Sequence, residues 1–304
     1  MRDGGGYDTI GAVSPILRLC LRRALLAVCR YGPAAARDRI RRLPFSRFAP
    51  ALPRLIGGRE IVVWRGVRLR EDPGEMEGFF KFFWSDGPDP EYDWLLQASS
   101  GASVFADIGA NHGIYALALT QAHPRLRAVA FEPDRQMAEQ IRHNLTLNPD
   151  VAGRVDIVEA AVGAASGVAL FAPSAGTNSG VGRLIEGHGG GGATEVTVVR
   201  LADHCQASGV RPDVIKFDVE GAELDVLRGL GDLAGTIAAI SIELHAYLIA
   251  EEARTEFKRS ALELFAAMPL HWRFLLNDQD WRETLSVEEE WPVRVHAFGR
   301  QRLR

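Results

Sequence analysis

Residues 104–117 read VFADIGANHGIYAL, and FEPD follows at residues 131–134. The first three residues of the longer stretch are apolar and predict a buried strand that ends at Asp107. Gly109 and Gly113 then mark a tight turn, after which the apolar spacing becomes helical. The shorter stretch closes a second apolar run with an acidic residue. The order strand, glycine turn, helix, strand and acid predicts half of a nucleotide-binding α/β unit.

The residue types in this unit indicate a ligand with an amino-acid end and an adenosine end. Glycine lets the backbone approach a ligand closely, and the free N–H groups that begin a helix favour an anionic group. The glycine spacing departs from the G-x-G-x-x-G pattern of a dinucleotide site. Ile114 and Tyr115 also occupy positions where a helix that packs closely on a diphosphate would need small residues. Asp107 would repel a diphosphate but suits an ammonium group, and Glu132 can accept hydrogen bonds from a ribose diol. S-adenosylmethionine combines these features; the alternative is a strand–turn–helix unit that binds no ligand.

A third motif, IKFDVEGAEL at residues 215–224, completes a resemblance to a known family. Together with DIGANHG and FEPD, it resembles the FkbM-type methyltransferases over roughly residues 90–245. The resemblance implies an α/β Rossmann-like class I fold, with a mostly parallel seven-stranded sheet and helices on both faces. It also implies an S-adenosylmethionine-dependent methyltransferase (EC 2.1.1.-) that acts on a hydroxyl group of a sugar, lipid or natural product.

Strand and helix patterns alternate along this region, which predicts a parallel sheet. We expect strands near 103–107, 128–132, 155–159, 213–218 and 237–243, and helices near 113–122, 134–147 and 221–230. A helix over 246–268 follows, and by resemblance strands at 271–276 and 292–299 form a closing antiparallel pair. The methyltransferase domain is expected to span 90–304. Residues 1–89 are expected to form an accessory segment.

The accessory segment is strongly basic although the whole chain carries a net charge of −4. Residues 1–70 hold fifteen arginines, no lysine and four acidic residues, a net charge of +11. Residues 14–31 predict a basic amphipathic helix, residues 59–70 a hairpin, and residues 75–84 are dense in aromatic side chains. The helix either packs on the catalytic domain or contacts a membrane surface or an acidic partner. Its arginines interrupt every apolar run well short of a membrane span.

The amino-acid composition indicates in which cellular compartment the protein works and which classes of partner it binds. The three cysteines form no C-x-x-C pair and fit a reducing compartment, so we expect a cytoplasmic enzyme. Peripheral membrane contact through the basic helix is the alternative to packing of that helix on the catalytic domain. No aromatic residues are interleaved with the basic cluster, which argues against nucleic acid as a partner. The expected partner is a small-molecule, sugar or lipid-linked methyl acceptor.

Each predicted parallel strand ends in an acidic residue, at the edge where open α/β sheets bind ligands. Because unpaired buried charge is costly, these acids predict a sulfonium cofactor, a bound cation or both. By resemblance, the segment after the third strand lies near the adenine. The predicted cofactor-binding residues are Asp107, Gly109, Ala110, Asn111, Gly113, Glu132, Glu159 and Ala160.

The predicted catalytic residues form two i, i+2 pairs on neighbouring strands. One pair is Asp218 and Glu220, and the other is Glu243 and His245. Methyl transfer to a hydroxyl requires a positioned acceptor oxygen and removal of its proton. In one interpretation Asp218, Glu220 and Glu243 hold a divalent cation, for which oxygen ligands suit Mg²⁺. In another, His245 is the base and Glu243 orients it. A structural role is the alternative, with Asp218 as a helix cap and Glu223 facing the helix dipole.

Two other classes of function remain open at this point. One is an NAD-dependent oxidoreductase or epimerase on the same half-fold, against which the missing third glycine and Asp107 argue. The other is a binding protein that kept the fold without turnover, against which the intact turn and Glu132 argue.

Overall fold

The computed structural model describes residues 61–70, 89–172, 182–185, 192–277, 280–293 and 295–301. The predicted basic helix at 14–31 and aromatic stretch at 75–84 lie outside these residues. The predicted hairpin is confirmed: β1 (Ile61–Trp64) and β2 (Val67–Arg70) form a two-stranded sheet. Their turn has positive φ at Arg65 (47°) and Gly66 (88°), as a two-residue hairpin turn requires.

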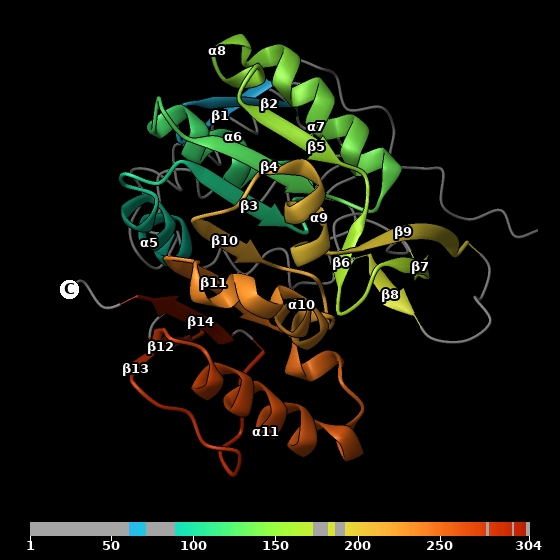
Figure 1. The fold of residues 1–304 in the computed structure, drawn as a ribbon, viewed down its shortest axis with the longest axis vertical. Coiled ribbons are helices and arrows are strands. Elements are labelled where there is room, and N and C mark those ends of the chain that lie inside the picture. Colours follow the sequence, from blue (N-terminus) through green and yellow to red (C-terminus); the bar gives the residue numbers. More distant parts are fainter. Residues whose placement is uncertain are drawn as a thin grey trace, which may run out of the picture. The chain divides into compact units, whose positions relative to one another are not determined.

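The central sheet runs in the order β13-β12-β14-β11-β10-β3-β4-β5 (Figure 1). The parallel strands are β3 (Val104–Ile108), β4 (Arg127–Phe131), β5 (Val155–Val158), β10 (Val214–Phe217) and β11 (Ala239–Leu244). The antiparallel strands are β12 (His271–Leu276), β13 (Asp280–Arg282) and β14 (Val295–Arg300). The expected Rossmann-like α/β fold and its closing antiparallel pair are confirmed. The short edge strand β13 brings the sheet to eight strands, because it pairs back onto β12.

Helices alternate with the parallel strands, as the pattern predicts; α5 precedes the first of these strands and α11 follows the last. They are α5 (Pro90–Ala98), α6 (Ile114–Ala122), α7 (Arg135–Leu147), α8 (Pro149–Ala152), α9 (Leu201–Ser208), α10 (Glu223–Leu230) and α11 (Glu251–Ala267). Two 3₁₀ helices, η3 (Gly231–Gly235) and η4 (Ala246–Leu248), complete the set within the described residues. The single helix expected over 246–268 is divided into η4 and α11, because the backbone is extended at Ile249. Across the described residues, no helix has both the length and the apolar character to cross a membrane.

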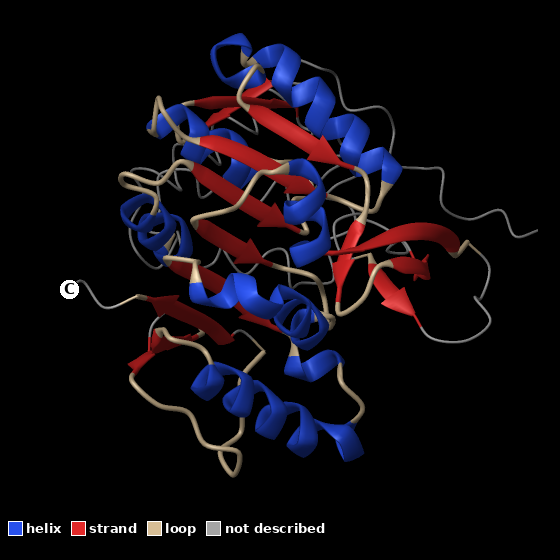
Figure 2. Ribbon diagram, in the orientation of Figure 1, coloured by secondary structure: helices blue, strands red, loops and turns tan. Residues whose placement is uncertain are grey.

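A second sheet, which the sequence pattern does not predict, is formed by residues between the third and fourth parallel strands. It contains β6 (Ala161–Gly163), β7 (Gly167–Ala172), β8 (Arg183–Ile185) and β9 (Thr194–Arg200), in the order β6-β9-β7-β8 (Figure 2). β6 and β8 have only three residues each, and β7 and β9 are largely accessible to solvent, so this sheet lacks the burial on both faces that marks the central strands, although β7 reads GVALFA.

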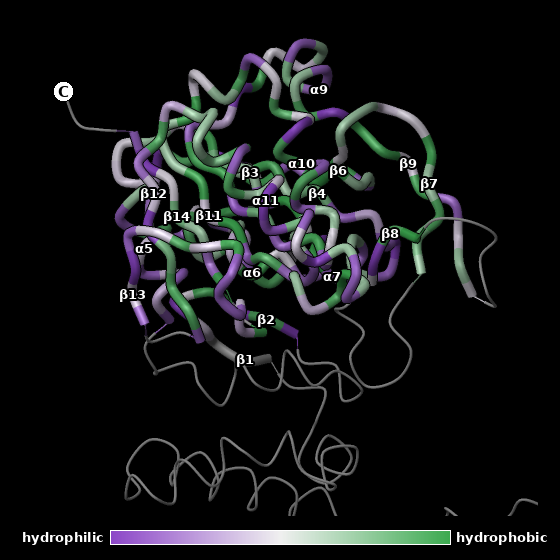
Figure 3. Tube along the Cα trace, turned by 90° about the horizontal axis from the view of Figure 1, so that it is seen from below, coloured by the Kyte–Doolittle hydropathy of each residue, from purple (hydrophilic) through white to green (hydrophobic). Residues whose placement is uncertain are grey.

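The two faces of the central sheet differ in chemistry. One face carries apolar residues of the core, such as Ile215 and Ile240, which pack against the buried sides of α10 and α11. The apolar stretches of the central strands stand out in Figure 3. On the other face, the strand register aligns Asp107, Lys216 and Ser241 in one row. This second face is covered by α5 and α6, and we call it the polar face because it carries these buried polar side chains beside apolar ones such as Phe105 and Val214.

The strand order reverses between β3 and β10, which places a ligand-binding crevice at their carboxyl ends. Here the turn after β3 touches the loop after β10. Gly109 has φ +77°, and a Cβ on it would lie 1.8 Å from the carbonyl oxygen of Asp218. Only glycine permits this approach, so the DIGANHG turn and the DVEGAE loop form one continuous surface.

Candidate active site

The glycine turn is fastened to the end of β4 by its backbone. The N–H groups of Gly109 and Ala110 both donate to the carbonyl oxygen of Phe131, at 3.0 Å each. Asn111 (φ 52°) and Gly113 (φ 72°) then take left-handed conformations, and α6 begins at once. The turn therefore lies where the sequence predicts it, and it adopts the left-handed backbone angles that its glycines suggest.

Glu132 joins this turn to the chain that follows β4. Its Oε2 accepts a hydrogen bond from the N–H of Asn111 and its Oε1 accepts one from the N–H of Asp134, both at 2.8 Å. The side chain is buried, and burial raises the pKa of Glu132 to about 7 against the opposing effect of those two hydrogen bonds. A carboxylate has about four lone-pair sites, so two further donors can still be accommodated. Two ribose hydroxyls would meet that requirement.

Asp107 lies near the end of β3 and faces the start of α6. Its Oδ2 accepts a hydrogen bond from the N–H of Ala116 at 3.0 Å, and its side chain is almost fully buried. A carboxylate at this helix N-terminus is stabilised by the helix dipole. The structure thus gives Asp107 a role within the turn itself, and its predicted contact with an ammonium group stays a prediction.

The segment after β5 is less clearly part of the site. Glu159 is exposed, and its Oε2 forms an ion pair with Arg142 of α7 at 2.9 Å. Ala160 is buried. The ion pair accounts for the charge of Glu159, and the place of both residues beside an adenine stays a prediction.

His245 follows β11 and lies among four carboxylates. Its Nδ1 is 2.6 Å from Oε1 of Glu223. Its Nε2 is 3.4 Å from Glu220, 3.7 Å from Asp218 and 3.9 Å from Glu243. Burial lowers the pKa of His245, but the Glu223 hydrogen bond and the surrounding negative charges outweigh it and raise the pKa to about 10. The surrounding carboxylates therefore favour the protonated form of this imidazole.

The three acids of the DVEGAE motif reach His245 through a turn. β10 ends at Phe217, so Asp218 and Glu220 lie in the loop, and the expected alternation on a strand end is wrong. Glu220 instead has a left-handed φ of 50°, and Gly221 follows with φ 105°. A glutamate in this region carries a backbone cost, which is typical of functional sites. The turn aims both acids at one imidazole nitrogen.

Glu223 contacts His245, although the sequence pattern suggested only a helix-dipole role for it. It is the first residue of α10, is fully buried, and also accepts the N–H of Gly221 at 2.8 Å through Oε1. It makes the short contact with His245 that was expected of Glu243. A usable signal was present: Glu223 shares the apolar side of α10 with Leu227 and Leu230 at i, i+4 and i+7. A charge on that side needs a partner.

Lys216 supplies positive charge on the polar face of the sheet. Its Nζ lies 3.2 Å from Oδ2 of Asp218 and 4.8 Å from the centre of the Tyr115 ring. Burial lowers the pKa of Lys216, but the negative charges of Asp218 and Glu91 outweigh it and raise the pKa. The Tyr115 hydroxyl hydrogen-bonds to Glu91, and α5 thereby joins the same network. Tyr115 and Glu91 were not among the predicted site residues.

The predicted metal ligands are divided between two groups. Among the described residues, Asp218, Glu220 and His245 form one group whose ligand atoms lie within 4.8 Å of one another. Glu243 belongs to a second group, with Glu91 and His296. The expected Mg²⁺ set of Asp218, Glu220 and Glu243 is thus not brought together as one group, although Glu243 remains close to His245.

Residues 107–282 match the Methyltransferase FkbM domain family. The chain belongs to this family. The matched region begins at Asp107 and includes the glycine turn, Glu132, the DVEGAE loop and His245. The resemblance inferred from the three motifs is therefore confirmed.

Several curated proteins are similar to the FkbM domain. Hexuronic acid methyltransferase AglP of Haloferax volcanii is 29% identical over 158 residues, 50% of this chain and 60% of that protein. The 2-O-methyltransferase NoeI of Sinorhizobium fredii is 32% identical over 141 residues, 41% of this chain and 56% of that protein. AMB antimetabolite synthetase AmbE of Pseudomonas aeruginosa is 29% identical over 47% of this chain, which spans only 8% of AmbE. The chain therefore spans less than two thirds of each of these relatives.

A solved structure of an FkbM methyltransferase, from Methylobacillus flagellatus, matches 71% of this chain and 49% of its own. The sequence identity is 16% and the TM-score is 0.45. An O-methyltransferase from Bacillus cereus, solved in complex with SAH, matches 70% of this chain at 15% identity and a TM-score of 0.41.

Proposed function

We propose that this chain is an S-adenosylmethionine-dependent O-methyltransferase whose acceptor is a sugar hydroxyl, free or carried on a lipid or natural product. The observation that carries the proposal is His245, held by Glu223 and facing the same sheet edge as the glycine turn and Glu132. Family membership supports methyl transfer. The names of two relatives, a hexuronic acid methyltransferase and a 2-O-methyltransferase, support a sugar hydroxyl.

The residues around the crevice fit this cofactor. Glu132 keeps acceptor sites for the ribose hydroxyls, and Gly109 lets the glycine turn pack directly against the loop at Asp218. Asp218, Glu220 and Glu243 give the crevice negative charge, which suits a cationic ligand. When bound, the cofactor supplies a methyl group on a positively charged sulfur.

The role of His245 is to take the proton of the acceptor hydroxyl at Nε2. Glu223 accepts the hydrogen bond of Nδ1–H and so fixes the tautomer and the direction of the ring. To act as the base, His245 must have Nε2 deprotonated, with its proton lost to solvent, when the acceptor hydroxyl binds; a cationic ligand held nearby would favour that neutral form. Asp218 and Glu220 face the same nitrogen and can hold the acceptor hydroxyl in place.

Tyr247 supports a sugar as the acceptor. It follows His245 by two residues, its ring centre lies 5.9 Å from the imidazole, and 42% of it is exposed. Burial and the charge of Glu220 raise the pKa of its hydroxyl to about 12, so the ring stays neutral. An exposed aromatic face beside the base suits the apolar face of a pyranose ring.

A bound Mg²⁺ is the second candidate for activating the hydroxyl. Asp218, Glu220 and His245 lie close enough to share an ion. The 2.6 Å contact between Nδ1 of His245 and Glu223 orients the ring as a general base requires, so we favour the base. Loss of turnover in EDTA, restored by Mg²⁺ and abolished in Glu220→Gln, would favour the ion instead.

The cofactor proposal is tested by calorimetry on the full chain. S-adenosylhomocysteine is expected to bind with a micromolar dissociation constant, and NAD is expected to give no heat. Tight NAD binding without S-adenosylhomocysteine binding would overturn the proposal. Transfer of a labelled methyl group to methyl glucuronide or methyl fucoside, followed by mass spectrometry, then tests the acceptor class. Methylation of a small catechol alone would contradict a sugar acceptor.

Glu223→Gln is expected to shift the pH dependence of turnover. Glu223 raises the pKa of His245, so removing its charge lowers that pKa, and the rising limb of kcat moves to lower pH by about 1 unit. The same change is expected to lower the plateau of kcat about 10-fold, because the ring is less firmly oriented. Asp225→Asn, on the exposed side of α10, is the control and should leave the profile unchanged. An unshifted limb in Glu223→Gln would remove Glu223 from the mechanism.

A further inference from the structure

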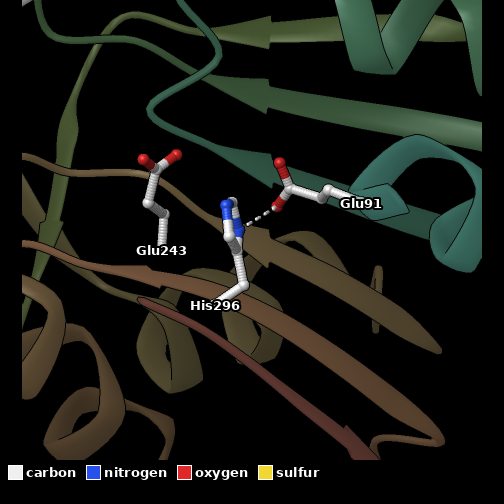
Figure 4. A group of neighbouring side chains, drawn as sticks. All are labelled: Glu91, Glu243 and His296. Atoms are coloured by element: carbon white, nitrogen blue, oxygen red, sulfur yellow. Dashed lines mark ion pairs between the residues drawn. The ribbon is translucent and has the colours of Figure 1, made fainter. Parts of the chain in front are cut away.

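A second group of ligating side chains lies on the polar face of the sheet, formed by Glu91, Glu243 and His296 (Figure 4). The antiparallel register of β11 and β14 sets Glu243 directly opposite His296. Glu91 comes from the first turn of α5 and points toward both. Three elements that are far apart in the sequence thus present two carboxylates and one imidazole to a single point.

The spacing of these groups suits an ion better than direct hydrogen bonds. Their ligand atoms all lie within 4.8 Å of one another, and Nδ1 of His296 is 4.0 Å from Oε1 of Glu91. That separation is too long for a hydrogen bond. Ligand atoms at about 2.1 Å from a tetrahedral ion are about 3.4 Å apart. The three side chains would therefore bind one ion after shifts of about 1 Å or less. In the group of Asp218, Glu220 and His245, by contrast, the imidazole already forms a 2.6 Å hydrogen bond with Glu223.

Outer contacts hold the ligands in the required directions. The hydroxyl of Ser241 donates to Oε1 of Glu91 at 2.8 Å, and the Tyr115 hydroxyl bonds to the same carboxylate. The His296 ring stacks almost parallel to Phe298, with ring centres 5.9 Å apart. In known metal sites, hydrogen bonds and packing of this kind orient the side chains that bind the metal directly.

The charges of the group also call for a cation. Glu91 and Glu243 are buried carboxylates that face the same space, and only 7% and 19% of their side chains are exposed. Lys216 also interacts electrostatically with both carboxylates, but its ammonium group lies against Asp218 at 3.2 Å. Two like charges in a region of low dielectric are costly unless a positive charge lies between them.

We propose that Glu91, Glu243 and His296 form a binding site for a divalent first-row transition-metal ion, with Zn²⁺ as the best match. One imidazole and two carboxylates suit such an ion, whereas Mg²⁺ and Ca²⁺ prefer oxygen ligands alone. The ion ties α5 to β11 and β14 and fixes Glu243, whose Oε1 lies 3.9 Å from Nε2 of His245. The site is independent of the proposed reaction, since metal binding requires neither cofactor nor acceptor.

The proposal is tested by metal titration of the full chain after treatment with EDTA. The wild type is expected to bind one Zn²⁺ tightly, to gain thermal stability from it, and to show a Co²⁺ absorption spectrum of low-symmetry coordination. His296→Gln is expected to weaken Zn²⁺ binding at least 100-fold and to lose the thermal shift. His271→Gln, an exposed histidine on β12, is the matched control and should bind as the wild type does.

His245→Gln separates this group from the first one. Retained binding in His245→Gln with loss in His296→Gln supports the proposal. The reverse pattern assigns the ion to Asp218, Glu220 and His245 and overturns it, as does a wild type that binds no Zn²⁺. If His296→Gln does not fold in EDTA, Glu91→Gln replaces it, since the amide can keep the hydrogen bond from Ser241.

Discussion

His245→Asn is expected to lower kcat by about 10²–10⁴-fold while the dissociation constant of S-adenosylhomocysteine changes less than about threefold. The reason is that Nε2 of this residue faces the acceptor side of the crevice, while the glycine turn and Glu132 make no hydrogen bond to it in the described residues. Asparagine keeps a polar side chain that can still meet Glu223 but has no group that titrates near neutral pH. Single-turnover kinetics with saturating cofactor and calorimetry on the same sample separate the two effects.

The buried surroundings of His245 require a control for folding. His271→Asn, on the exposed edge of β12, should match the wild type in both measurements. The thermal midpoint of His245→Asn should also fall most at neutral or acidic pH. The pKa of His245 is raised from 6.5 to about 10 in the folded protein, so its stabilising contribution is full below about pH 6.5 and disappears as the pH rises through 10. Normal turnover in His245→Asn would exclude this residue as the base.

The fold was predictable because the parallel strands are short, mostly apolar runs with an acidic residue at or near their carboxyl ends. β3 and β4 differ by at most one residue at each end from the segments expected from the pattern. The second sheet was not predictable in the same way. In β7, Val168 is 68% exposed, so the strand is not held by burial on both faces and carries no clear period.

The sequence predicted which residues lie in the candidate site, but it did not predict which of them contact one another. Acidic strand ends indicated Asp218, Glu220 and Glu243 correctly as neighbours of His245. Their pairing depends on the left-handed backbone at Glu220, which a sequence pattern does not reveal for a residue other than glycine or asparagine. For the same reason the sequence pattern predicted that Glu243 orients His245. In the structure Glu223 lies closer to His245, because the turn of the DVEGAE loop brings it there.

His296 and Glu91 show a second limit of sequence reasoning. Glu91 precedes the first recognised motif and His296 follows the last one, so neither belongs to a pattern that names a function. They meet only because β14 inserts between β12 and β11 and pairs antiparallel to both. A strand order of this kind is a property of the complete sheet, and local spacing does not determine it.

Glu132→Gln is expected to weaken S-adenosylhomocysteine binding by about 10–100-fold with a smaller effect on kcat at saturating cofactor. Hydrogen bonds to a charged acceptor contribute about 1.5–3 kcal/mol each, and an amide keeps one acceptor oxygen while losing the charge. Glutamine can still accept one of the two backbone hydrogen bonds from Asn111 and Asp134, so the turn should remain folded. Calorimetry at fixed pH gives the change in affinity, and Glu139→Gln on the exposed side of α7 is the control.

The pH dependence of the same binding distinguishes a direct contact from a loosened turn. Burial raises the pKa of Glu132 to about 7 in the free protein, and two ribose hydroxyls donate better to the carboxylate than to the protonated acid. Wild-type affinity should therefore increase as the pH rises from about 6 to about 8, with release of a proton on binding. Glu132→Gln has no such proton, so its affinity should be nearly flat over that range. A wild type without this dependence, or a variant that keeps it, would show that Glu132 organises the turn without touching the cofactor.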